Sequence, residues 1–442
     1  MAIIRTSDLD AFVRDVDDHG GNPHHPELLR KYHPFELRPD FTVDQSLDPF
    51  SPEYFRQQIA LYEEITGRTL DQETGELHPS DIEHLFTEPN PLGIRDTGHI
   101  AEHLRALSTI LSLSCLGTSP RVLDMGAGHG VSSEMFAFAG CSVHAVDIDP
   151  VLGQLSRRRA AVRNLDITRN EGNYDDLGFL PDGAYAAAFF FQSLHHCLRP
   201  WELIGALAEK LAPDGVIAFA GEPIQSIWWK HWGLRLDQES LYVARALGWF
   251  ESGWSQSFIR DCFARNGMRL SLFSGGNAGS FFGVATRSDA RHEQVLARAA
   301  GLALSEVVPG ASPRVPDGSY HTQCGVRTEF CGRPAFAQLP GQAGAITFGP
   351  YVSLPAGAYE FSMLVGTARA AGGIGHEFAY DVVCDGATAT LFSGRARPPR
   401  TAQPVVIAHR FTTTRPVEAV EIRVLLPADL GMVVSLPVIA AV

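Results

Sequence analysis

Residues 121–130, Arg-Val-Leu-Asp-Met-Gly-Ala-Gly-His-Gly, hold an apolar run that ends in Asp124 and continues into three glycines at alternate positions. A helical pattern covers residues 132–139, and a second apolar run, residues 142–147, ends in Asp147. The order predicts a strand, a glycine loop, a helix and a strand that ends in an acid. Glycines without a Cβ let main chain approach a ligand closely, and such an acid can accept hydrogen bonds from ribose hydroxyls.

The spacing of the glycines narrows the kind of cofactor. The loop has the form G-x-G-x-G and Val131 follows Gly130, so the dinucleotide fingerprint G-x-G-x-x-G is absent. The Gly-Lys-Ser/Thr of a phosphate-binding P-loop is absent too. Together with the two acids, the loop predicts an adenosyl cofactor. A glycine-rich turn in an ordinary α/β sheet is the alternative.

The pattern Val-Leu-Asp-x-Gly-x-Gly-x-Gly at residues 122–130 resembles motif I of class I S-adenosylmethionine (SAM) dependent methyltransferases. The resemblance implies SAM as cofactor and S-adenosylhomocysteine as product. It also implies that the glycines cradle the methionine and ribose, and that Asn173 reads adenine where related enzymes carry Gly-Asp; a solvated loop asparagine is the alternative. The residues expected at the cofactor are Asp124, Gly126, Gly128, Gly130, Asp147, Asn173 and Gln192.

The chain length and the cysteine content limit the classes of protein to which this sequence could belong. A chain of 442 residues is long enough for two to three domains. We expect no membrane span, because no apolar run reaches the ~18 residues that a bilayer requires. The N-terminus is acidic and has no apolar signal-peptide core. Seven scattered cysteines argue against a disulfide framework, so we expect a cytoplasmic protein.

The net charge of −14 is concentrated at one end of the chain. The first hundred residues hold 20 acidic and 8 basic residues, and the rest is close to neutral. An acidic chain repels phosphate backbones, so nucleic acid is not the expected partner. We expect a small-molecule or glycan acceptor. Self-association of the chain into a homo-oligomer is an alternative that the sequence does not decide.

Predicted strands and helices alternate from residue 121 to about residue 287, which is typical of an α/β sheet with helices on both faces. The chain is therefore predicted to contain a seven-stranded, doubly wound, Rossmann-like methyltransferase sheet, with an N-terminal helical lid and a C-terminal all-β sandwich built from short alternating runs separated by turns. The expected strands are 121–125, 142–147, 166–171, 184–192, 216–222, 268–273 and 281–287. The expected domains are 1–115 (lid), 116–290 (methyltransferase), 291–309 (helix and linker) and 310–442 (β-sandwich).

Two adjacent histidines, His195 and His196, follow the fourth expected strand, and Glu222 ends the fifth. Ligands in open α/β sheets bind beyond the carboxyl ends of the strands. A neutral imidazole there can take the proton of an attacking hydroxyl, with Glu222 in support. We favour His196 slightly; a histidine that only shapes the loop is the alternative. The three residues could also ligate a metal, but no His pair at i,i+4 and no Cys cluster fixes such a site, so no metal is predicted.

The segment after the fifth strand is rich in tryptophan. Trp232, Arg235 and Asp237 form a plausible sugar-binding surface, in which an aromatic face packs on a pyranose and charged groups bind hydroxyls. The alternative for Trp228 and Trp229 is a hydrophobic lid that packs on the N-terminal helices.

A second resemblance is to methyltransferases encoded among bacterial glycosyltransferase and cell-surface polysaccharide genes. It runs through residues 61–65, 195–197, 222–224 and 232–237, and through 348–359 in the tail. It implies methyl transfer to a hydroxyl of a sugar or glycan-related molecule, in polysaccharide biosynthesis. The alternatives are a natural-product (polyketide-type) methyltransferase and a non-catalytic protein that binds a glycan or a partner.

Overall fold

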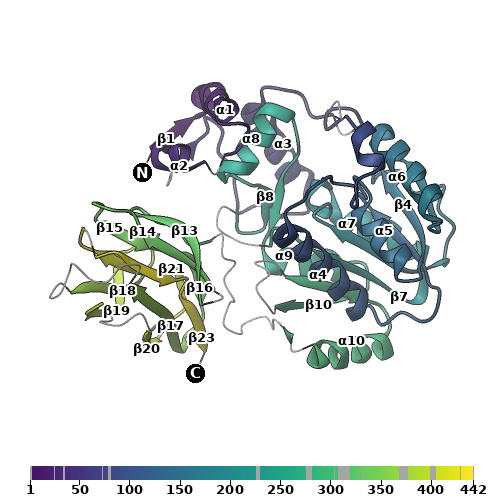
Figure 1. Ribbon diagram of the computed structural model, residues 1–442. Coiled ribbons are helices and arrows are strands. Elements are labelled where there is room, and N and C mark those ends of the chain that lie inside the picture. The colour runs from purple at the N-terminus through teal and green to yellow at the C-terminus, as the bar shows by residue number, and fades with distance from the viewer. Residues whose placement is uncertain are drawn as a thin grey trace. The chain divides into compact units, whose positions relative to one another are not determined.

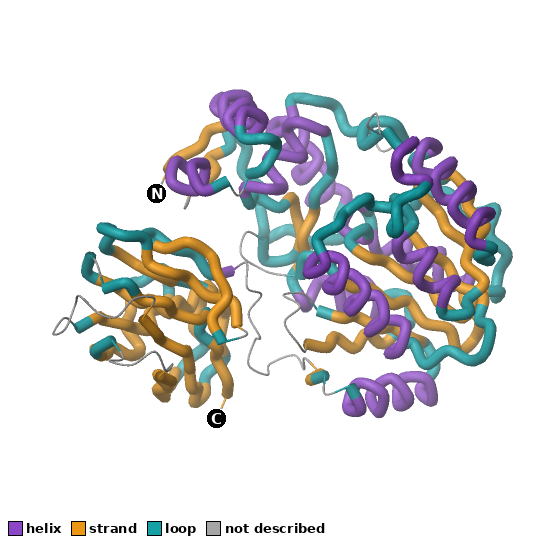
Figure 2. The backbone as a smooth tube through the Cα atoms, viewed as in Figure 1, coloured by secondary structure: helices purple, strands orange, loops and turns teal. Residues whose placement is uncertain are grey.

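The computed structural model of the protein describes residues 2–23, 25–32, 35–71, 73–77, 81–224, 229–274, 281–302, 304–306, 319–331, 333–367, 377–398, 405–428 and 430–441. The chain divides into two compact units (Figures 1 and 2). One spans residues 39–306, and the other combines residues 1–38 with the C-terminal part of the chain after residue 306. The boundaries expected from the sequence at residues 115, 290 and 309 stay predictions.

A mixed β-sheet forms the centre of the first unit. Its strands lie in the order β12-β10-β11-β7-β6-β3-β4-β5, and the five from β7 to β5 are parallel. The bounds are β3 (Arg121–Met125), β4 (Ser142–Asp147), β5 (Ile167–Glu171), β6 (Tyr185–Phe191), β7 (Leu211–Ala220), β10 (Arg269–Ser274), β11 (Phe282–Thr286) and β12 (Ser305–Glu306). All seven predicted strands are present, and the two-residue β12 adds an eighth. The sheet fits a Rossmann-like methyltransferase fold.

Helices cover both faces of this sheet because the strands are apolar on both faces. Side chains at alternate positions, such as Val122, Phe189 and Ala218, share one core with helices α4, α5 and α10. On another helix, Phe263 of α9 stacks on Phe219 of β7. The bounds are α4 (Thr97–Leu113), α5 (Val131–Phe138), α6 (Pro150–Arg163), α7 (Pro200–Lys210), α9 (Gln256–Ala264) and α10 (Asp289–Gly301).

A cap made from two distant segments packs beside the strand ends. It contains α3 (Pro52–Thr66), α8 (Gln238–Leu247) and a small two-stranded sheet, β8 (Trp232–Leu234) with β9 (Ser252–Trp254). Buried tyrosines hold the segments together: Tyr54 Oη donates to Trp232 O at 2.6 Å, and Tyr62 Oη donates to Gly248 O at 2.5 Å. Ser51 is the N-cap of α3, and its side chain accepts from Tyr54 N; neither α8 nor the β8–β9 pair was predicted from the sequence.

The second unit is mostly β-structure. Two antiparallel sheets share one hydrophobic core, which includes Phe336, Phe361, Val382 and Ile422. The strands are β13 (Gly325–Phe330), β14 (Arg333–Gln338), β17 (Gly357–Thr367), β20 (Val405–Thr413), β22 (Met432–Ser435) and β23 (Val438–Ala441) in one sheet, and β15 (Gly344–Thr347), β16 (Pro350–Leu354), β18 (Phe378–Cys384), β19 (Ala389–Ala396) and β21 (Val417–Leu426) in the other. An all-β C-terminal module is therefore present, as predicted.

The N-terminal residues of this unit form a small α/β element. Strands β1 (Ala2–Arg5) and β2 (Phe35–Arg38) pair in parallel, and α1 (Leu9–Asp18) and α2 (Pro26–Tyr32) connect them. Within the described ranges of the whole chain, no helix is both long enough and apolar enough to cross a bilayer. Trp228, one of the two tryptophans for which a hydrophobic lid is the alternative, lies outside the described residues.

Candidate functional site

The glycine loop between β3 and α5 adopts backbone conformations that side chains disfavour. Gly126, Gly128 and Gly130 have φ values of 67°, 49° and 90°. A Cβ at Gly126 would lie 2.4 Å from Tyr174 Oη and 2.6 Å from Ser193 Cβ. Both conformation and space therefore demand glycine at position 126.

Asp124 fixes the glycine loop through hydrogen bonds to the helix that follows the loop. Its carboxylate is buried and accepts hydrogen bonds from Ser132 Oγ at 2.7 Å and from Ser133 Oγ, both in the first turn of α5. Burial raises the pKa of Asp124 to about 6, against the opposing effect of the two serine hydroxyls. The carboxylate ties the last residues of β3 to the start of α5, on either side of the glycine loop.

Asp147, the acid that ends β4, lies directly beside the glycine loop. Gly128 N donates to Asp147 Oδ2 at 2.7 Å, and Arg169 of β5 places Nη2 3.1 Å from Asp147 Oδ1. Arg169 Nη1 also donates to Gly128 O at 2.7 Å. The sequence reasoning missed Arg169, which occupies a buried position in a strand and carries no motif. Gly128, Asp147 and Arg169 each contact the other two, and these contacts fix the position of the glycine loop relative to Asp147.

The other two predicted cofactor residues differ in their surroundings. Asn173 Oδ1 accepts hydrogen bonds from the main-chain nitrogens of Asp175 and Asp176, at 3.0 and 3.1 Å. Its amide oxygen therefore shapes its own loop, and the contact of Asn173 with adenine stays a prediction. Gln192 is exposed at the end of β6, with a φ of 53°. A residue absent from the prediction, Tyr174, reaches the glycine loop and donates to Ser193 O at 3.2 Å.

Glu222 organises the turn η3 (Leu194–His196) that carries the two histidines. Its buried carboxylate accepts from the main-chain nitrogens of Ser193, Leu194 and His195 at 2.9, 3.1 and 3.1 Å. It also lies 2.8 Å from His195 Nδ1. The supporting role predicted for Glu222 thus has a structural basis, because one carboxylate holds both the turn and the imidazole.

The histidines meet two glutamates that the sequence reasoning missed. His195 Nε2 lies 3.3 Å from Glu251 Oε2, and His196 Nε2 lies 3.9 Å from Glu251 Oε1. On its other side, His196 Nδ1 lies 3.4 Å from Glu76 Oε2. Glu251 stands in an apolar stretch, Trp-Phe-Glu-Ser-Gly-Trp at 249–254, and a buried acid there was the available clue. Glu76 lies in a polar segment that offers none.

Two opposite electrostatic effects act on His195. Burial lowers the pKa of its imidazole, but the carboxylates of Glu222 and Glu251 outweigh burial and raise the pKa to about 9. For Glu251, burial raises the pKa, and His195, His196 and Arg235 reverse this and lower it to about 2. Without another cation, His195 and Glu251 therefore form a charged pair. His196 is the more exposed of the two histidines.

The predicted acceptor residues fall into two groups. Trp232 is only 1% exposed, and its Nε1 donates to Pro49 O at 2.8 Å, so the ring packs inside the cap and offers no face for a sugar. Trp229 is also buried and donates to Leu234 O, in line with the lid alternative. Arg235, in contrast, reaches the cluster: its Nη1 lies 3.5 Å from Glu251 Oε2 and its Nε lies 2.9 Å from Asp237.

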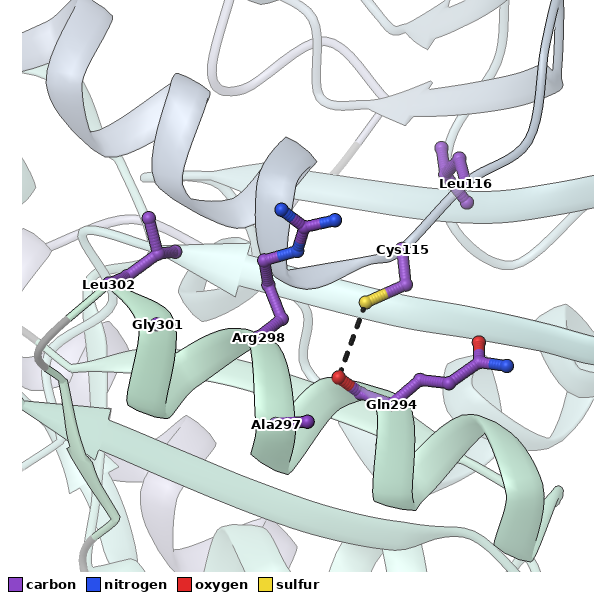
Figure 3. Close-up of a pocket in the computed structure, with 7 residues that line it drawn as sticks. All are labelled: Cys115, Leu116, Gln294, Ala297, Arg298, Gly301 and Leu302. Carbon is purple, nitrogen blue, oxygen red and sulfur yellow. Dashed lines mark hydrogen bonds between the residues drawn. The ribbon is translucent and has the colours of Figure 1, made fainter.

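A surface hollow elsewhere in this unit carries none of the predicted site residues. Cys115 and Leu116, in the connection before β3, face one side of α10, and Cys115 Sγ lies 3.5 Å from Gln294 O (Figure 3). The connection lies at the amino end of β3, whereas the glycine loop follows the carboxyl end. We therefore place the candidate site at the loops, not at the hollow.

Comparison with known proteins shows which family the central part of the chain resembles. Residues 97–269 match a family model described as a methyltransferase domain. Ubiquinone biosynthesis O-methyltransferases are similar to part of the chain: that of Xanthomonas campestris pv. campestris (strain B100) is 31% identical over 97 residues, 22% of this chain and 41% of the relative. That of Xanthomonas oryzae pv. oryzae (strain PXO99A) is 32% identical over 95 residues, covering 22% and 40%. The chain thus spans about two fifths of the length of these relatives.

Solved structures show further similarity. A SAM-dependent methyltransferase from Mesorhizobium loti has 17% identity and a TM-score of 0.34, over 42% of this chain and 97% of that one. Geranyl diphosphate C-methyltransferase from Streptomyces coelicolor, solved with Mg²⁺, geranyl diphosphate and S-adenosylhomocysteine, has 13% identity and a TM-score of 0.36, over 55% and 100%. The family match confirms the predicted methyltransferase domain and agrees with SAM as its cofactor.

Proposed function

We propose that this protein transfers the methyl group of SAM to a hydroxyl of a sugar or glycan-related small molecule. The observation that supports the proposal is the juxtaposition of two sites on neighbouring strands. The glycine loop follows β3, and the histidine turn follows the adjacent β6. Ser193, at the start of that turn, donates through Oγ to Met125 O, directly before the loop. A methyl donor on the loop would thus lie beside the histidine–glutamate cluster.

The loop residues would hold the cofactor. Gly126 removes the Cβ that would press against Tyr174 and Ser193, and Gly128 presents main chain next to Asp147. Asp147 is positioned for the ribose hydroxyls, with Arg169 fixing its direction. When bound, SAM supplies an electrophilic methyl group on sulfur; the protein supplies position and exclusion of water.

The cluster would act on the acceptor. A hydroxyl becomes a good nucleophile only as it loses its proton, and we assign the acceptance of that proton to the imidazole of His196, because His195 is already paired as a cation with Glu251. His195 is buried between two carboxylates, and His196 is more exposed, so the acceptor would approach on the His196 side. The name of the similar curated proteins, O-methyltransferases, supports a hydroxyl as the acceptor.

The C-terminal module is part of the same proposal. We infer that its two sheets form a β-sandwich that contacts a glycan or mediates self-association. This inference rests on the second sequence resemblance.

The test is binding followed by turnover. Calorimetry with SAM and S-adenosylhomocysteine should give one site per chain, and Asp147→Asn should weaken it. A panel of sugars, nucleotide sugars and phenolic natural-product intermediates, incubated with SAM and scored by mass spectrometry, should show a mass gain of one methylene on a sugar. A protein that binds neither cofactor form is a non-catalytic binding protein, and methylation of phenols alone would favour the natural-product alternative.

A further inference from the structure

We propose that His195, His196 and Glu251 together bind one divalent transition-metal cation, of the Zn²⁺ or Mn²⁺ type. The binding itself is independent of the proposed methyl transfer; only its place next to the acceptor rests on that function. The three residues offer two imidazole nitrogens and one carboxylate, a donor set that suits these ions. Sequence analysis predicted no metal because the third ligand, Glu251, lies far along the chain from the histidine pair.

The distances suit a single ion. One ligand atom from each residue can be chosen so that all three lie within 4.8 Å of one another. Glu251 Oε2 lies 3.3 Å from His195 Nε2, and Glu251 Oε1 lies 3.9 Å from His196 Nε2. Zinc binds nitrogen and oxygen at about 2.0–2.2 Å, so ligand atoms around one ion stand roughly 3.0–3.5 Å apart. The three ligand groups would therefore have to draw closer around a bound ion.

Each histidine already has the outer partner that metal-binding histidines require. His195 Nδ1 lies 2.8 Å from Glu222, and His196 Nδ1 lies 3.4 Å from Glu76, while both Nε2 atoms face Glu251. Carboxylates behind ligating imidazoles fix the tautomer and ring direction. Glu222 is itself held by three main-chain nitrogens, and Glu76 accepts from Phe250 N at 3.0 Å. The two rings are therefore aimed before any ion arrives.

The local charge favours a cation. Three carboxylates, those of Glu76, Glu222 and Glu251, surround the two imidazoles. Arg235 brings one positive charge, which it shares with Asp237. Glu222 and Glu251 are 2% and 7% exposed, so solvent screens their charge only weakly. A dication at their centre would offset most of this charge. Beside the acceptor, it would also favour the ionised form of a hydroxyl, which refines the proposal of a free imidazole base.

A second group of possible ligands provides a matched control. His19, His25 and Glu27 also bring their ligand atoms together, but they are partly or fully exposed, in the other unit. The outer partner of His19 Nδ1 is the main-chain oxygen of Asp15, at 2.7 Å, and not a buried carboxylate, so we assign this exposed group no site. Removing them in the double variant His19→Ala/His25→Ala isolates the buried cluster.

The test uses the full chain stripped of metal. Co²⁺ is titrated in and followed by its visible absorption, and Zn²⁺ is titrated by competition. The His19→Ala/His25→Ala protein should bind one equivalent of Co²⁺ with the wild-type affinity. In that background, Glu251→Gln and His195→Ala should each lose binding by at least about 100-fold, and Glu222→Gln should lose about 10–100-fold. Glu251→Gln preserves the shape of the side chain, so it remains informative if His195→Ala fails to fold.

Calorimetry with SAM on the same proteins separates the two proposals. Normal SAM binding with no Co²⁺ binding, or with Co²⁺ binding that Glu251→Gln leaves intact, overturns the metal site and leaves the proposed function standing. Loss of Co²⁺ binding in the His19→Ala/His25→Ala control also overturns it. Co²⁺ bound at the buried cluster without any SAM binding upholds the metal site and defeats the proposed function.

Discussion

The glycine loop and the histidine cluster lie on adjacent strands, yet they are assembled in different ways. The loop depends mostly on neighbours in sequence: Asp124, the glycines and Asp147 all fall within residues 124–147, and Arg169, Tyr174 and Ser193 add contacts from outside that range. The cluster gathers Glu76, His195, His196, Glu222 and Glu251 from four separate segments. The glycine loop is therefore built mainly from residues that are close in sequence, whereas the histidine cluster forms only when the whole unit is folded.

The largest expected effect on cofactor binding would come from a side chain in the glycine loop. Gly126→Ala would force a Cβ against Tyr174 and Ser193 at a φ of 67°, and we expect SAM binding to weaken by at least about 100-fold, which is 2.7 kcal/mol or more. Gly140→Ala is the control, because its φ is 95° and its Cβ would meet nothing within 4 Å. It should cost roughly 1–2 kcal/mol of stability and leave SAM binding intact. Equal SAM binding in both variants would contradict a cofactor at this loop.

Removing the carboxylate of Glu222 should affect the cluster more than the loop. Glu222→Ala leaves three main-chain nitrogens and one imidazole without their buried acceptor. We expect a loss of about 3–5 kcal/mol in the free energy of unfolding, measured by urea denaturation. Glu222→Gln keeps one oxygen acceptor and should lose less. If the alanine variant were as stable as the wild type, the turn would not depend on this side chain.

A pH-dependent effect should distinguish Asp124 from its neutral replacement. Its pKa is about 6 in the folded protein and about 3.8 when unfolded. The folded state therefore holds a proton that the unfolded state has lost, and stability falls as pH rises through this window. Relative to Asp124→Asn, the wild type should lose up to about 3 kcal/mol between pH 4 and pH 7. Parallel pH profiles of unfolding free energy for the two proteins would refute the raised pKa.

The smallest effect should come from a hydrogen bond within the cap. Tyr54→Phe removes the hydroxyl that donates to Trp232 O, and burial raises the pKa of Tyr54 to about 12, so this hydroxyl is neutral. We expect a loss of about 1 kcal/mol in unfolding free energy, with SAM binding unchanged. A larger loss of SAM binding than of stability would show that the cap also shapes the cofactor site.

The same contrast explains how far the sequence could be interpreted. Strand β4 was predicted with its observed bounds, because an apolar run that ends in Asp147 defines it locally. Helix α8 was missed, although Asp237 is its N-cap and accepts from Ser240 N at 2.9 Å. We had interpreted Asp237 as a substrate residue. The sequence shows an aspartate at position 237, but it does not by itself show that this aspartate begins a helix.

The site residues follow the same rule. His195, His196 and Glu222 could be proposed because they end adjacent parallel strands, a position that topology makes functional. Glu76 and Glu251 could not, because only the packing of the cap carries them to the histidines. Trp232 was misjudged for a related reason: its composition suggests a ligand surface, but its burial depends on α3, far away in the chain.

The cap has a consequence for how this unit could be rebuilt. The ends of the strands provide the imidazoles. The two cap segments, which Tyr54 and Tyr62 hold together, provide Glu76 and Glu251, the acids that face the imidazoles. A transplant of the central sheet with its glycine loop into another scaffold would carry along the capacity to hold a nucleoside. The transplanted sheet would carry the histidines but not Glu76 and Glu251. The acceptor site would therefore require both cap segments to be transferred together.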